Sequence, residues 1–91
     1  MISKLLRIEG RVQGVGYRYW ATREATKLGL VGWVRNRLDG SVEALVQGEE
    51  SAIAAFVWAA RQGPASADVS RIQSEVVEAG SFTAFRQLPT G

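Results

Sequence analysis

The chain has 91 residues and a net charge of +2, with no cysteine and no histidine. This length fits one domain, and the composition excludes disulfides, thiolate chemistry, and the commonest general base and metal ligand. Eight of the eleven basic residues but only two of the nine acidic ones lie in residues 1 to 37. This asymmetry favours an anionic partner, with a scatter of solvated arginines as the alternative. The apolar runs are too short for a signal peptide or a membrane span, which predicts a soluble, cytoplasmic protein.

The first third of the chain predicts a strand, a loop and a helix. Apolar residues alternate with Arg7 and Glu9 in a strand that ends near Arg11. A glycine-rich loop follows. Apolar residues then recur at helical spacing from Tyr17 to Leu28, directly before a glycine that ends the helix.

The rest of the chain predicts a hairpin, a second helix and two further strands. The predicted elements are a strand at 30–37, a turn at 38–40, a strand at 41–47, a helix from about 49 to 63, a strand at 69–78 and a short strand at 82–86. The order βαββαβ is typical of the split βαβ or ferredoxin-like fold, an α+β domain with two helices on one face of an antiparallel sheet. We expect the first strand to be central and to lie beside the strand that follows the first helix.

Between Gly10 and Arg18 the sequence reads GRVQGVGYR, with three glycines just before a predicted helix. Glycines let backbone amides turn toward one point, and a helix N-terminus adds unpaired donors and a positive dipole end, so this loop predicts an anion site. Arg18 opposes the helix dipole at a cost of roughly a few tenths of a kcal/mol unless an anion offsets it. The alternative is an ordinary turn with a solvated arginine. The spacing matches neither a Walker loop nor a dinucleotide fingerprint, which argues against a nucleotide site.

Asn36 stands at the end of the second predicted strand, between two arginines. The predicted topology brings Asn36 toward the glycine loop, although asparagine is also a common turn former. Strand alternation predicts that Arg35 and Arg37 point to the opposite face. The three tryptophans lie on different elements and are interpreted as packing residues, with Trp58 partly exposed because it falls off the apolar face of its helix.

Three features occur in order between about Leu6 and Phe85: GRVQGVGYR, the asparagine in GWVRNRLDGSVEALVQG, and a Gly-Pro after the second helix. Together they resemble the acylphosphatases, which implies one acylphosphatase-like domain over residues 1–91. The resemblance implies hydrolysis of an acyl phosphate to a carboxylate and inorganic phosphate, without metal or cofactor. The residues that it assigns to phosphoryl binding are Arg18 and the loop amides of Gln13, Gly14, Val15, Gly16 and Tyr17, and it assigns the orientation of the attacking water to Asn36. Tyr17 stands where many members have phenylalanine, and the C-terminal PTG is less typical of the family.

This chemistry agrees with what the chain lacks. An acyl phosphate expels a carboxylate, which is a weak base, so the reaction needs no general acid. Charge on the phosphoryl oxygens is stabilised by fixed N–H donors and a bidentate guanidinium. Neutral Asn36 orients water without taking its proton. The expected partners are a small acyl phosphate and inorganic phosphate, and the expected form is a monomer without nucleic acid or membrane.

Two other classes of function stay open. An RNA-binding module has the same topology, but its stacking aromatics are missing from the first and third predicted strands. The second is a degenerate phosphate-binding or regulatory domain, like the acylphosphatase-like segments of larger carbamoyl-transfer maturation proteins. The length of the chain and the presence of both Arg18 and Asn36 argue against this reading. A direct hydrolysis assay separates the three.

Overall fold

Seven elements make up the fold in the computed structural model, which describes all residues from 1 to 91. They are β1 (Ile2–Arg11), α1 (Tyr17–Lys27), β2 (Val31–Asn36), β3 (Val42–Gly48), α2 (Glu50–Ala60), β4 (Asp68–Val77) and β5 (Phe85–Gln87). Every predicted element is present, and the fold class is confirmed. The final strand begins at Phe85, later than predicted.

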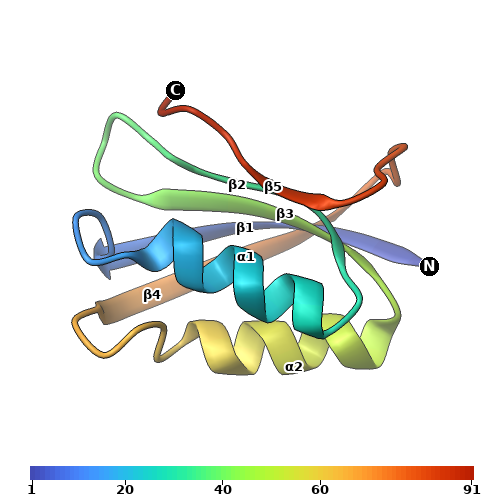
Figure 1. Ribbon diagram of the computed structural model, residues 1–91, viewed down its shortest axis with the longest axis horizontal. Coiled ribbons are helices and arrows are strands. Elements are labelled where there is room, and N and C mark those ends of the chain that lie inside the picture. Colours follow the sequence, from blue (N-terminus) through green and yellow to red (C-terminus); the bar gives the residue numbers. More distant parts are fainter.

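The strands form one sheet in the order β4-β1-β3-β2-β5, with both helices on one face (Figure 1). The four long strands pair antiparallel, as predicted, whereas β5 pairs parallel to β2. The expected contact between β1 and β2 is wrong. β3 lies between them and pairs with both. The crossover from β1 to β2 and the crossover from β3 to β4 each join strands two positions apart, so each has a strand of the other between its ends.

The core lies between the helices and the sheet. Apolar side chains that alternate along the strands meet the inner sides of both helices, and α1 contributes mostly small residues there. The fully buried apolar side chains include Leu6, Ile8, Val34, Val42, Ala44 and Val46 from the strands and Tyr17, Ala21, Ala25, Ile53, Phe56 and Ala60 from the helices. Burying a side chain of the size of Leu6 or Phe56 stabilises the fold by about 1.5–3 kcal/mol.

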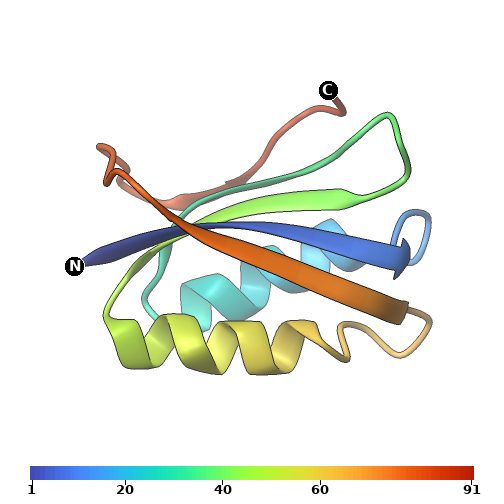
Figure 2. The ribbon, with the colours of Figure 1, turned by 180° about the vertical axis from the view of Figure 1, so that it is seen from behind.

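The other face of the sheet carries no helix (Figure 2). One end of it is covered by the segment between β4 and β5. Gln47 is buried there and holds Gly80 by two hydrogen bonds, donating to its carbonyl at 2.9 Å and accepting from its amide at 2.8 Å.

The tryptophans behave as packing or surface residues. Trp20 lies between Tyr17 and Phe56, with ring centroids 5.4 and 6.3 Å away. Trp58 is 74% exposed, which confirms that it lies off the apolar face of α2, and its ring is 5.7 Å from the Arg61 guanidinium. Neither helix is long and apolar enough to cross a membrane.

Candidate active site

The loop between β1 and α1 carries a run of unpaired backbone donors. Gly14 and Gly16 have φ angles of 75° and 81°, the left-handed region that glycine enters without strain. The backbone amides of residues 13 to 19 donate to no carbonyl of the chain. The first turn of α1 also contains no acidic side chain. The loop therefore combines free N–H groups with the positive end of a helix dipole, a combination that suits an anion.

Arg18 lies in the first turn of α1, as predicted, and is half-buried. Its Nη1 donates to the Leu88 carbonyl at 3.3 Å, which ties it to the segment after β5. No carboxylate lies within ion-pair distance of it. A neutral carbonyl uses one of the five guanidinium donors and leaves the charge uncompensated.

Asn36 is the last residue of β2, as predicted. Its carbonyl accepts a hydrogen bond from the Gly91 amide at 3.0 Å, so its backbone is held by the same C-terminal segment that contacts Arg18. The side chain is half-buried and lines a pocket shared with Arg18. The two residues therefore converge although β3 separates β1 from β2.

This pocket has a volume of about 210 Å³. The residues that line it are Val12, Gly14, Gly16, Tyr17, Arg18, Tyr19, Asn36 and Gln87. Sequence reasoning missed three of them. Tyr19 is 61% exposed and follows Arg18 directly, so an aromatic residue beside the arginine was the available signal. Val12 directly precedes Gln13 in the glycine motif, whereas Gln87 is placed by the pairing of β5 with β2, which no local pattern shows.

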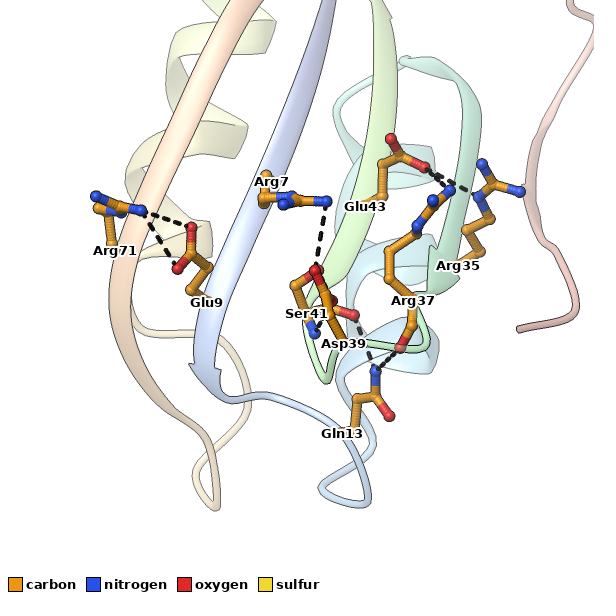
Figure 3. A network of polar contacts seen from close by, with 9 residues as sticks. All are labelled: Arg7, Glu9, Gln13, Arg35, Arg37, Asp39, Ser41, Glu43 and Arg71. Carbon is orange, nitrogen blue, oxygen red and sulfur yellow. Dashed lines mark hydrogen bonds and ion pairs between the residues drawn. The ribbon is translucent and has the colours of Figure 1, made fainter. Parts of the chain in front are cut away.

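Three side chains of the predicted phosphate loop point elsewhere. Nε2 of Gln13 donates to the Arg37 and Ser41 carbonyls at 2.8 and 2.9 Å (Figure 3). Val15 packs against the core. Tyr17 is buried, its hydroxyl donates to the Ala60 carbonyl at 2.7 Å, and burial raises the pKa of this hydroxyl. The phosphate-binding role predicted for these residues therefore rests on their backbone amides.

The neighbouring arginines of the hairpin are on the open face of the sheet. Glu43 accepts from Nε of Arg35 at 3.0 Å and from Nη1 of Arg37 at 3.2 Å (Figure 3). The prediction that both arginines point away from the face of Asn36 is confirmed. Their charges are paired, whereas that of Arg18 is not.

The hairpin turn is fixed by Asp39. Its Oδ1 accepts hydrogen bonds from the hydroxyl and the backbone amide of Ser41 at 2.6 and 2.9 Å. These two bonds hold the pKa of the Asp39 carboxyl below its usual range, with a smaller contribution from Arg7, which is 3.4 Å away. These contacts restrain the turn next to Asn36.

Comparison with known proteins finds similar sequences and similar solved structures. A family model described as Acylphosphatase matches residues 4–87. An acylphosphatase of Nitrobacter hamburgensis is 51% identical over 95 residues, which cover 98% of this chain and 96% of that protein. The crystal structure of acylphosphatase from Bacillus subtilis is 38% identical, with a TM-score of 0.94 over 97% of this chain and 99% of that one. Full-length HypF in its phosphate- and nucleotide-bound form is 30% identical, with a TM-score of 0.91 over 98% of this chain and 12% of HypF.

Proposed function

Because this chain belongs to the acylphosphatase family and is therefore a hydrolase, we propose that the pocket shared by Arg18 and Asn36 is its active site. The phosphoryl group binds to the backbone amides of residues 13 to 17 and to Arg18, and Asn36 orients the attacking water. One observation carries this proposal. Unpaired backbone amides, an arginine without a carboxylate partner and a strand-end asparagine line one pocket of about 210 Å³.

Phosphoryl binding follows from the donors. The loop amides have no backbone acceptor of their own and are free to bind an anion, and the helix dipole adds a positive potential without a titratable group. The Arg18 guanidinium binds two phosphoryl oxygens with its remaining N–H groups, a geometry that a planar fork provides. In the transition state these donors meet growing charge on the oxygens, and each well-placed one contributes about 3 kcal/mol.

The reaction itself moves few protons. The water oxygen attacks phosphorus and the bond from phosphorus to the acyl oxygen breaks, so that the carboxylate leaves with the bonding electrons. Asn36 holds the water by a neutral amide, which does not act as a base at any ordinary pH. The water proton passes to a phosphoryl oxygen or to solvent. The carboxylate leaves as a weak base and needs no proton from the enzyme.

The first experiment is hydrolysis of benzoyl phosphate by the purified protein in the presence of a chelator. We expect turnover that the chelator does not change. Alkyl phosphate monoesters are expected to be poor substrates, because an alkoxide leaving group needs protonation and the proposed mechanism assigns no general acid. Absence of turnover, or turnover that the chelator abolishes and a metal restores, would contradict the proposal.

We also propose that the protein acts as a monomer in the cytoplasm, without a nucleic-acid partner. The support against RNA is that β1 and β3 contain no aromatic residue on which a base could stack. Sedimentation at working concentration tests the monomer. Titration with a single-stranded RNA tests the second point, and saturable binding that phosphate leaves unchanged would contradict it.

A further inference from the structure

Gln13 connects the two parts of the proposed active site. It lies in the loop that carries the free amides and Arg18, but its side chain reaches the hairpin that carries Asn36. Both hydrogens of Nε2 are used there, on the carbonyls of Arg37 and Ser41 at 2.8 and 2.9 Å. Figure 3 shows the amide nitrogen turned to the hairpin and the amide oxygen turned away from it.

This contact lies where the sheet no longer holds the two segments together. β1 and β3 pair only as far as Ile8 and Val42. Beyond Ile8, β1 continues as a partner of β4 alone, up to Arg11. The glycine loop and the hairpin end therefore leave the sheet separately, and Gln13 spans the gap between them.

The hairpin does not depend on Gln13 for its own hydrogen bonds. The Ser41 carbonyl also accepts from the Arg37 amide at 2.8 Å, and the Arg37 carbonyl also accepts from the Gly40 amide at 3.2 Å. Loss of the Gln13 side chain therefore leaves neither carbonyl without a donor. What is lost is the direct link between the loop and the hairpin, which leaves the C-terminal segment as the connection between Arg18 and Asn36.

We propose that Gln13 is a positioning residue that fixes the position of the loop amides and Arg18 relative to Asn36. This inference rests on the proposed function, since it assumes that the loop binds the phosphoryl group and Asn36 the water. The proposed phosphate site is formed by the loop and α1 alone, so phosphate binding is largely independent of the Gln13 side-chain bonds to the hairpin, here called the brace. Attack by water requires both segments at once, and a misplacement of about 1 Å is enough to slow it many-fold.

The test uses Gln13→Met, which keeps the length and the neutral charge of the side chain but removes both donors. We expect kcat for benzoyl phosphate to fall about tenfold or more, while the inhibition constant of inorganic phosphate changes less than about threefold. Gln62→Met is the matched control, because Gln62 is exposed beyond α2 and outside the pocket, and it should match the unsubstituted protein. A raised phosphate inhibition constant would show that the Gln13 side chain binds the anion itself. An unchanged kcat with a lower Tm would show a purely structural role, and either result overturns the proposal.

A double-mutant cycle separates action through Asn36 from action through the rest of the site. If Gln13 positions the loop against Asn36, Gln13→Met should have little further effect on kcat in an Asn36→Ala background. Full additivity of the two effects would overturn the inference. The parent Asn36→Ala protein supplies the reference rate.

A readout without turnover separates this inference from the proposed function. Absence of hydrolysis by the unsubstituted protein would contradict the proposed function alone. The brace is then judged by the side-chain amide resonances in solution. We expect slow exchange of the Gln13 side-chain amide protons, and a shift of the Asn36 side-chain amide resonance in Gln13→Met but not in Gln62→Met. Rapid exchange of the Gln13 protons, or an unmoved Asn36 resonance, would contradict the brace.

Discussion

The Tyr17 hydroxyl satisfies a carbonyl that α2 leaves without a donor. Ala60 is the last residue of α2, and the residue four positions later, which would donate to its carbonyl in a continuing helix, is Pro64. Proline has no N–H. The hydroxyl of Tyr17 takes its place at 2.7 Å, from a ring that is only 1% exposed. Tyr17→Phe removes this donor and keeps the ring.

The expected cost follows from that geometry. Removing one partner of a buried hydrogen bond leaves the other unsatisfied, at a cost of about 1–3 kcal/mol. For a domain of this size each kcal/mol lowers Tm by about 4–8 °C, so a loss of about 1.5 kcal/mol corresponds to about 6–12 °C. Thermal and urea denaturation followed by circular dichroism measure both quantities. Tyr19→Phe is the matched control, because Tyr19 is 61% exposed, and it should change stability by less than about 0.5 kcal/mol.

The pH dependence gives a second check of the same hydroxyl. Burial raises the pKa of Tyr17 in the folded protein above its value of about 10 in the unfolded chain. The folded state therefore retains a proton that the unfolded chain loses, and this contribution is complete below pH 10 and declines as the pH rises above it. The stability gap between the unsubstituted protein and Tyr17→Phe should narrow above about pH 10. Equal stability of the two proteins at pH 7 would refute the reasoning.

Three further predictions concern the site and its hairpin. Arg18→Lys should be nearly as inactive as Arg18→Ala, since an ammonium group does not reproduce bidentate geometry. Inorganic phosphate should raise the Tm of the unsubstituted protein but not of either variant. Equal stabilisation of Arg18→Ala by phosphate would remove Arg18 from the site. Asn36→Ala should lower kcat by about 100-fold or more with little change in the inhibition constant of phosphate. Asn36→Asp should also be inactive, because its carboxylate repels the anionic substrate. A near-normal kcat in a folded Asn36→Ala protein would leave Asn36 as a turn residue. Ser41 holds the pKa of Asp39 low, so the stability that this carboxylate contributes is present above the unfolded pKa of about 4 and is lost as the pH falls through the folded value. Urea denaturation below pH 4 should therefore show that the free energy of unfolding falls less steeply with decreasing pH for Asp39→Asn than for the unsubstituted protein. An identical pH dependence of the two proteins would contradict this.

Periodicity predicted the elements well because it reports burial directly. The alternation in β3 and the helical spacing from Tyr17 onward coincide with the buried faces of those elements. β5 was placed too early because a three-residue strand has no measurable period, and its parallel pairing with β2 depends on contacts remote in sequence. The neighbour of β1 was wrong for the same reason, since β3 enters between β1 and β2 from a separate crossover.

The sequence pointed to site residues where a residue type alone implies a chemistry, and the roles of those residues stay predictions. The glycines and Arg18 indicate an anion site from local sequence, and strand-end Asn36 lies in the same pocket. The structure alone showed the bracing bonds of Gln13 and the partner of the Tyr17 hydroxyl. Each joins segments more than twenty residues apart, 24 and 43 residues in these cases, and no local pattern encodes such a pairing.

The C-terminal segment has a consequence for how the protein refolds. The Leu88 amide donates to the Val34 carbonyl, the Leu88 carbonyl accepts from Arg18, and the Gly91 amide donates to Asn36. The contact between Arg18 and Leu88 closes a span of 70 residues, and contacts of long sequence separation form slowly. We expect a chain whose core has condensed around both helices to gain this last restraint on its two polar groups later. Burial of Trp20 should accordingly recover earlier than catalysis after dilution from urea, and the interval between them measures the docking of a few terminal residues.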